Sequence, residues 1–125
     1  MTRQSIQPRT SHFVIDLHGA YIRRTDLRDA NLTRANLEAA DCSGADFSGA
    51  VLKDANLRNA ILVDARLNGA DLDGANLEGT NLKGADLTNV ENATAEQLQK
   101  AIVDVRTVLP EHLRLQLMHQ LVRTK

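Results

Sequence analysis

Hydrophobic positions recur every five residues along the middle of the chain. Between residues 15 and 89, every residue whose number is a multiple of five is small or aliphatic, and most are alanine. Two places later stands a leucine, except at Ile22, Cys42 and Phe47. These 75 residues hold fifteen consecutive repeats with no slip in phase.

A period of five fits neither regular secondary structure. In an α-helix each residue turns about 100°, so leucines five apart would spiral over the whole surface. In a straight strand, residues separated by an odd number point to opposite faces, so half of the leucines would face water. The pattern therefore predicts a coil with a corner at every fifth residue and a shared interior.

The fifth position of each repeat supports this interpretation, because it holds residues that accept tight-turn geometry. All seven glycines of the chain lie there: Gly19, Gly44, Gly49, Gly69, Gly74, Gly79 and Gly84. Asn or Asp occupies most of the other corners. The fourth position is variable and mostly polar, as expected of a side chain that points outward.

The repeated words A(D/N)LXX over residues 15–89 resemble the pentapeptide-repeat family. The resemblance implies an all-β solenoid, a right-handed quadrilateral β-helix in which four repeats make one coil. On that geometry the repeats form about 3.75 coils and a rod roughly 18 Å long. We expect three parts: an N-terminal tail and cap (1–14), the β-helix (15–89) and a C-terminal helical cap (90–125).

The C-terminal segment predicts two short helices. Thr94 and Gln97 have capping-box spacing, and apolar residues follow at helical intervals, so a first helix is expected over about 95–107. Pro110 suits the start of a second helix. Its apolar face is the candidate dimer or cap surface and comprises Leu113, Leu117, Met118, Leu121 and Val122. This face could either pack around the cap or mediate self-association, and the sequence favours neither.

The N-terminal residues 1–14 end in an apolar stretch, HFVI at 12–15, which we expect to fold over the first coil. The preceding residues contain Pro8 and few hydrophobic side chains. They are interpreted as a plain tail, with a basic arm as the alternative.

Composition narrows the setting and the partners. One cysteine excludes an intramolecular disulfide, and no apolar run resembles a signal peptide or a membrane span, so a cytoplasmic protein without membrane contact is expected. Residues 15–89 carry 8 basic and 12 acidic side chains. Because the rod has a net charge of −4, nucleic acid is not an expected partner.

No motif in the sequence indicates catalysis, a cofactor or a metal. Cys42 occupies a central leucine position and is predicted to be buried rather than reactive. His112 and His119 lie seven residues apart on the second predicted helix, roughly 10 Å, too far to share a metal. Asp and Asn alternate at the second position, which favours a hydrogen-bonding role at the corner over acid–base chemistry.

The residues that depart from the repeat are more informative than those that follow it. The second position, normally Asp or Asn, is Tyr21, Val51, Ile61 or Arg66, and Val63 lies beside Ile61. On the four-sided geometry Tyr21, Ile61 and Val63 share one side, and Val51 lies on the opposite one. These five residues are the candidate interaction surface.

The function that these features favour is that of a non-enzymatic scaffold that binds an unidentified protein partner or a second copy of itself. The alternative comes from the family resemblance, since some members mimic duplex DNA and modulate DNA gyrase. Duplex DNA carries one charge per about 1.7 Å, which the short and weakly acidic rod does not match.

Overall fold

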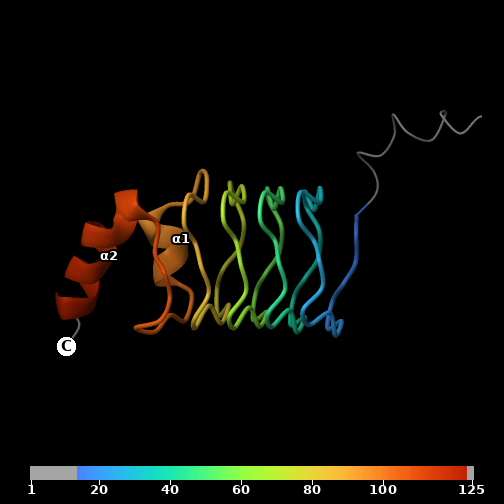
Figure 1. Cartoon of the computed structure of the whole chain (residues 1–125), viewed down its shortest axis with the longest axis horizontal. Coiled ribbons are helices and arrows are strands. Elements are labelled where there is room, and N and C mark those ends of the chain that lie inside the picture. The colour runs from blue at the N-terminus through green and yellow to red at the C-terminus, as the bar shows by residue number, and fades with distance from the viewer. Residues whose placement is uncertain (1–13, 124–125) are drawn as a thin grey trace, which may run out of the picture.

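The computed structural model describes residues 14–123, with side chains described as far as Met118. The chain winds into a stack of similar coils, and two helices lie beyond the last complete coil (Figure 1). The helices are α1, Ala95–Gln99, and α2, Glu111–Arg123. Neither is long and apolar enough to cross a membrane.

Four five-residue sides make one coil, because the second-position residues from Asp16 to Asp71 each pair in parallel with the residue twenty places on. One such column is Asp16, Asn36, Asn56 and Asn76. We number the sides in chain order. The first begins at residues 15, 35, 55 and 75, the second at 20, 40, 60 and 80, the third at 25, 45, 65 and 85, and the fourth at 30, 50 and 70.

Backbone hydrogen bonds join each coil to the next in one repeated pattern. The N–H groups at positions three and five donate to carbonyls of the following coil, as Leu37 does to Asn56 at 2.8 Å and Ala39 does to Arg58 at 3.0 Å. The N–H at position two donates to the preceding coil, as Asn56 does to Ala35 at 2.9 Å. The ladder therefore needs another coil on each side.

Alanine and leucine fill the interior as the sequence predicts. The leucines of the middle coils have almost no exposed surface, and Cys42 and Phe47 are completely buried in the same columns. Thr80 is also fully buried, and its hydroxyl donates to the carbonyl of Leu57 at 2.7 Å. The polar replacement of an alanine is thus satisfied by the neighbouring coil.

The corners owe their shape to side-chain hydrogen bonds and to left-handed backbone. At position two, the Asp or Asn Oδ1 accepts the N–H of the residue two places on, as Asn36 does from Glu38 at 3.1 Å. Position five has positive φ, both at glycines such as Gly74 and at Asp54 and Asn59. The predicted corner chemistry is confirmed.

The predicted first helix is wrong in its length. The capping box of Thr94 and Gln97 is present, but α1 ends at Gln99 rather than at 107. Residues 101–109 instead form part of a further, imperfect coil, in which Ile102 pairs with Asn81 and Val108 pairs with Asp86. A continued helix would leave the outward N–H and carbonyl groups of the last repeats without partners, whereas the extended chain satisfies them.

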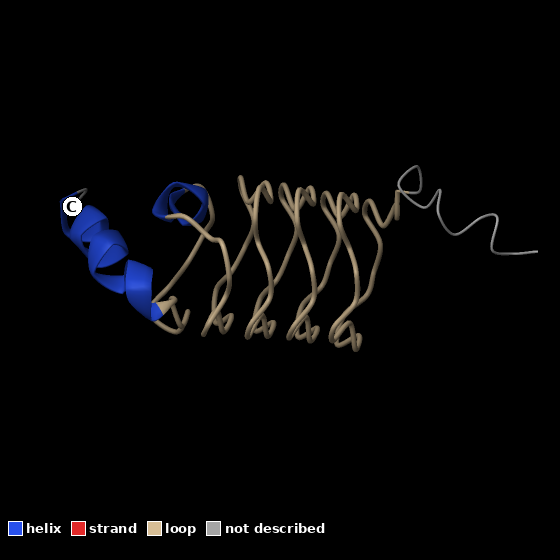
Figure 2. Ribbon diagram, turned by 90° about the horizontal axis from the view of Figure 1, so that it is seen from above, coloured by secondary structure: helices blue, strands red, loops and turns tan. Residues whose placement is uncertain are grey.

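In this last turn α1 takes the place of one side of a coil, the side above Asn76 (Figure 2). The Gln97 side chain replaces the N–H that a following strand would have donated to the Ala75 carbonyl, and it adds a second donor for Leu72. Its Nε2 donates to the carbonyls of Leu72 at 2.8 Å and Ala75 at 3.0 Å. Its Oε1 accepts the N–H of Thr94 at 2.8 Å, so all of the amide is used.

The first coil is less well covered than the others. Leu17, Ile22 and Leu27 are only partly buried, and Val14 and Ile15 are 55% and 43% exposed. Of the HFVI stretch, which was expected to fold over this coil, His12 and Phe13 lie outside the described residues. Val14 and Ile15 do not shield it from solvent.

We predict that Gln97→Ala lowers the free energy of unfolding by about 1–3 kcal/mol, because the Ala75 carbonyl loses its donor and the Leu72 carbonyl keeps only the N–H of Ala75. Gln99→Ala is the matched control, since Gln99 is exposed on the same helix and should change stability by less than about 0.5 kcal/mol. Urea unfolding followed by circular dichroism measures both. Equal effects would contradict the role of Gln97.

A second pair of variants separates backbone strain from crowding at the corners. Gly69 and Gly74 both have φ of 71°, but an added Cβ at Gly69 meets nothing, whereas at Gly74 it would overlap Oδ1 of Asp54. Gly69→Ala should cost about 1–2 kcal/mol from strain alone, and Gly74→Ala should cost more. Denaturant midpoints in the opposite order would refute this account.

Candidate functional site

The second side of the rod carries apolar residues at positions that are polar elsewhere. Its second-position column runs Tyr21, Asp41, Ile61, Asn81 and Ile102, each paired with the next. Tyr21 is 88% exposed, Ile61 37% and Ile102 45%. With one rung per about 4.8 Å, every other residue of this column is an exposed apolar side chain.

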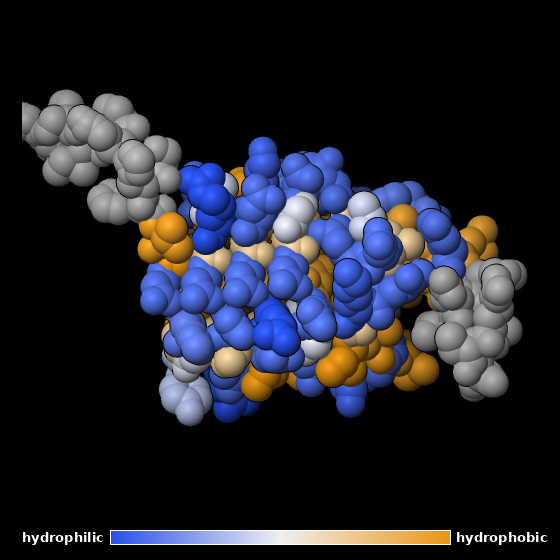
Figure 3. Space-filling view, turned by 180° about the vertical axis from the view of Figure 1, so that it is seen from behind, coloured by the Kyte–Doolittle hydropathy of each residue, from blue (hydrophilic) through white to orange (hydrophobic). Residues whose placement is uncertain are grey.

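Further exposed apolar residues lie where the second side turns into the third. Val105 is completely exposed and Val108 is 42% exposed, and both follow Ile102 in the last, imperfect coil. Figure 3 shows hydrophobic groups gathered along one edge of the rod, towards the end that carries the helices. The apolar column therefore widens towards the C-terminal end.

Sequence reasoning missed Ile102 and Val105 because it placed both on the first helix. One signal was available. Asp104 accepts the N–H of Arg106, two residues on, at 3.1 Å, which is the corner bond of the repeats. Its Oδ1 also accepts from Gly84 N–H at 3.1 Å, in place of a carbonyl. In the stretch VDVRT at 103–107, the Asp in second place with a polar residue two positions later resembles a repeat corner more than a helix interior.

The five residues predicted from departures in the repeat are not all brought together. Tyr21, Ile61 and the half-buried Val63 share the second side, as expected. Val51 is half-buried on the fourth side, between Asn31 and Asp71. Arg66 is exposed on the third side. Its backbone pairs with Asp46 in the preceding coil and with Asp86 in the following coil.

Arg66 has an electrostatic role on that side. Its guanidinium contributes to lowering the pKa of Asp46 and of Asp86, after the hydrogen bonds of Ser48 and Thr88 to these carboxylates. Burial opposes this at Asp86 and is the largest single influence on its pKa. A cation between two carboxylates is the arrangement expected of a structural ladder, so Arg66 needs no ligand to explain it.

A hollow of about 290 Å³ adjoins the apolar column of the second side. It is lined by Arg23, Arg24, Ser43, Gly44, Val63 and Asp64. Arg23 lies 3.8 Å from Asp41, and Asp64 is held by Arg106 at 3.0 Å. The Arg24 side chain has no hydrogen-bond or ion-pair partner among the described residues. The hollow thus places a cationic group beside the apolar positions.

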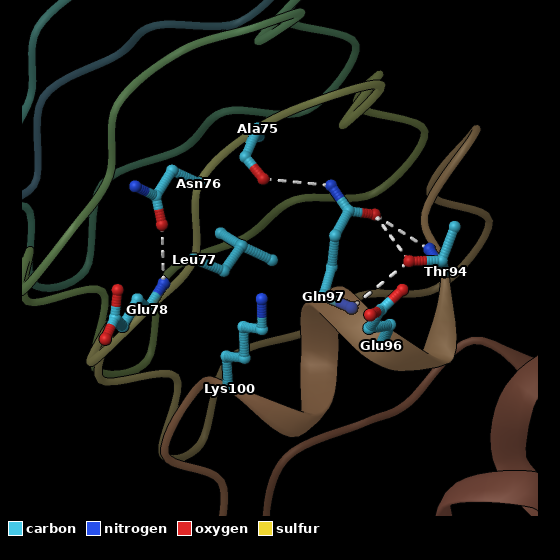
Figure 4. A pocket seen from close by; sticks show the side chains of 8 residues that line it. All are labelled: Ala75, Asn76, Leu77, Glu78, Thr94, Glu96, Gln97 and Lys100. Atoms are coloured by element: carbon cyan, nitrogen blue, oxygen red, sulfur yellow. Dashed lines mark hydrogen bonds between the residues drawn. The ribbon is translucent and has the colours of Figure 1, made fainter.

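A second hollow, of about 370 Å³, separates α1 from the last complete coil on the first side (Figure 4). Figure 4 shows Glu78 and Glu96 at its margins and the Lys100 side chain extending into it. The Gln97 amide is fully engaged, and the Thr94 hydroxyl accepts the N–H of Gln97 in the cap of α1.

The second helix divides its predicted apolar face. Leu113 and Leu117 are buried, at 7% and 6% exposure, within the hydrophobic core. Met118 is 48% exposed, and Leu115, on another face, is 82% exposed. Leu121 and Val122 lie beyond the described side chains. Of the described members, two therefore cover the rod and one faces solvent.

Groups that carry chemistry in other proteins are structural here. The Cys42 thiol is buried, and burial raises its pKa to about 12, so it stays protonated near neutral pH. In the described part of the chain, no cluster of three or more metal-ligating side chains occurs. His112 is an exposed residue at the start of α2, and the His119 side chain is not described.

Comparison with known proteins identifies the repeats. The family model for pentapeptide repeats matches residues 15–54 and 50–89. Rfr23, a pentapeptide repeat protein from the cyanobacterium Cyanothece 51142, is 37% identical, with a TM-score of 0.69, over 74% of this chain and 63% of its own. No curated protein matches the chain.

Two other solved structures are more distant. HetL, a pentapeptide repeat protein involved in heterocyst differentiation regulation in Nostoc sp. strain PCC 7120, is 28% identical, with a TM-score of 0.52, over 75% of this chain and 46% of its own. QnrB1, a plasmid-mediated fluoroquinolone resistance protein, is 16% identical with a TM-score of 0.45, over 85% of this chain and 82% of its own. The QnrB1 likeness is too low to carry a functional argument.

The chain thus spans less than two thirds of Rfr23 and about half of HetL. These pentapeptide-repeat neighbours imply a right-handed quadrilateral β-helix, in agreement with the twenty-residue register. The family and fold predicted from the repeated words are confirmed.

We predict that Asp46→Asn lowers stability slightly at pH 7 and by less at pH 3. The Asp46 carboxylate accepts the Ser48 hydroxyl at 2.6 Å, and this bond lowers its pKa below the usual range. Its extra stabilisation therefore exists above the unfolded-state pKa of about 3.9 and is lost as the pH falls. Asn keeps the bond geometry, as Asn31 does with Thr33. Urea midpoints at both pH values measure the difference, and a gap independent of pH would contradict it.

Proposed function

Since the chain belongs to the pentapeptide-repeat family, we propose that it is a non-enzymatic scaffold module that binds a protein partner through the second side of its rod. The observation that carries this proposal is the column of exposed apolar residues Tyr21, Ile61 and Ile102. Other second-position columns consist mainly of Asp and Asn, whose side chains are used at the corners. An apolar residue at this position makes no corner hydrogen bond. We infer that it contributes by contacting another molecule.

The proposed partner surface comprises Tyr21, Ile61, Val63, Ile102 and Val105. A rigid wall offers such residues in fixed positions, so little conformational entropy is lost when a partner covers them. Burying each isoleucine fully would contribute roughly 1.5–3 kcal/mol, and the part already covered by the rod reduces this. A few such residues suffice to dominate a small interface.

In this proposal, residues 15–89 form about 3.75 coils and the helices α1 and α2 act as the cap that ends the rod. Leu98, Leu113 and Leu117 support this role, because all three are buried against the core. The single cysteine, Cys42, is buried and fits action in a reducing compartment such as the cytoplasm. Modulation of gyrase by DNA mimicry has no specific observation in its favour.

The test uses the tagged full chain in its native host, with Ile61→Asp as the disruptive variant and Leu115→Asp as the control at another exposed apolar position. A true partner should co-purify with the wild type and the control but not with Ile61→Asp. Purified components should then show at least tenfold weaker binding for Ile61→Asp, about 1.4 kcal/mol. Retention of the same partner by Ile61→Asp would refute the assignment of this side.

A further inference from the structure

The N-terminal edge of the rod is an open β-edge. In every inner coil, the position-two N–H and carbonyl both point towards the preceding coil: Asn36 N–H donates to Ile15 at 2.8 Å, and Asn36 carbonyl accepts from Leu17 at 2.7 Å. The equivalent residues of the first coil have no preceding coil among the described residues, 14–123. They are Asp16, Tyr21, Asp26 and Asn31, and neither their N–H nor their carbonyl groups bond to a described residue.

The same edge is apolar in its centre. The first-coil residues Leu17, Ile22 and Leu27 are partly exposed, whereas their stacked counterparts Leu37, Cys42 and Phe47 are not exposed at all. Ile15 and Val14 add further exposed apolar surface beside them. An unpaired strand edge around an apolar centre is a template for another chain.

The pattern of partial charges favours a second copy of this chain, turned end for end. On each side of the first coil, one residue presents a positive N–H and a negative carbonyl side by side. In antiparallel pairing, directly opposed residues exchange both groups with each other. Two identical coils that face one another run in opposite directions on every side, so the position-two N–H and carbonyl groups of each edge can pair with those of the other.

Stacking the N-terminal edge on the C-terminal end of another copy is excluded by the cap. There Gln97 and the Ile102 backbone already use carbonyls of the last repeats. The N-terminal rim also carries both signs of charge, with Arg28 paired to Asp26 at 2.8 Å, so identical rims need not repel one another. A closed, two-fold pair is therefore the geometry that fits.

We propose that this protein self-associates head to head through its first coil. This goes beyond the scaffold function, because it uses the end of the rod and leaves the second side free. One coil of twenty residues presents less area than a standard protein–protein interface. We therefore expect a dimer with a dissociation constant roughly in the micromolar range.

The test compares Tyr21→Pro with Tyr21→Val in the full chain. Proline removes an N–H that no described residue uses, whereas valine removes only the ring. Sedimentation velocity over a concentration series should show a dimer for the wild type and for Tyr21→Val, and at least a tenfold higher dissociation constant for Tyr21→Pro. Ile15→Glu, which puts a charge at the edge, should act in the same way if Tyr21→Pro does not fold.

Leu115→Glu, on α2, and Ile61→Asp should leave the dimer intact. A dimer lost only with Leu115→Glu would overturn the proposal in favour of the helical end, and a monomer at all concentrations would also overturn it. Hydrogen exchange tests whether the same chain covers its own edge. A monomer in which the Tyr21 and Asp26 amides are protected would show that residues 1–13 pair with the edge, and this would also overturn the proposal. Loss of the dimer would not affect the partner test with Ile61→Asp, so the two proposals fail independently.

Discussion

The backbone hydrogen bonds between successive coils are the interaction on which the rest of this structure depends. Each repeat sends two N–H groups forward and one backward, and between Asp16 and Glu91 this exchange repeats in a constant register of twenty residues. The constraint fixes small residues at position one, a leucine-sized side chain at position three and positive φ at the corner. Regularity of sequence is a consequence of regularity in the ladder.

A ladder of this kind cannot end without leaving groups unpaired, and the two ends of the rod are treated differently. At the C-terminal end the chain abandons the repeat but continues the bonding. Gln97 donates from its side chain, Asp104 accepts with its side chain, and Ile102 pairs through its backbone. At the N-terminal end no described residue does this work for Tyr21 or Asp26. The asymmetry between the ends motivates the proposed self-association.

Because the ladder constrains most positions of the repeat, the residues that distinguish this protein occupy the positions that the ladder does not specify. Position two normally holds Asp or Asn, whose side chain secures the corner, so Ile61 and Tyr21 give up a local bond. Val51 also departs from the rule, but it is half-covered between Asn31 and Asp71. A departure in the sequence therefore marks an exposed candidate site only when the stacked neighbours leave it uncovered.

The sequence by itself determined the family, the buried positions and the corner chemistry, because each is dictated within five residues and is repeated many times. The four-sided register followed from the family resemblance and not from the spacing. It also located Tyr21, Ile61 and Val63 on one side. The end of the rod was decided by tertiary structure. Residues 101–109 have an apolar spacing that suits a helix, yet the open groups of Thr80, Leu82 and Ala85 draw them into an extended turn. Such pairing depends on which edge the chain meets, and local periodicity carries no information about that edge.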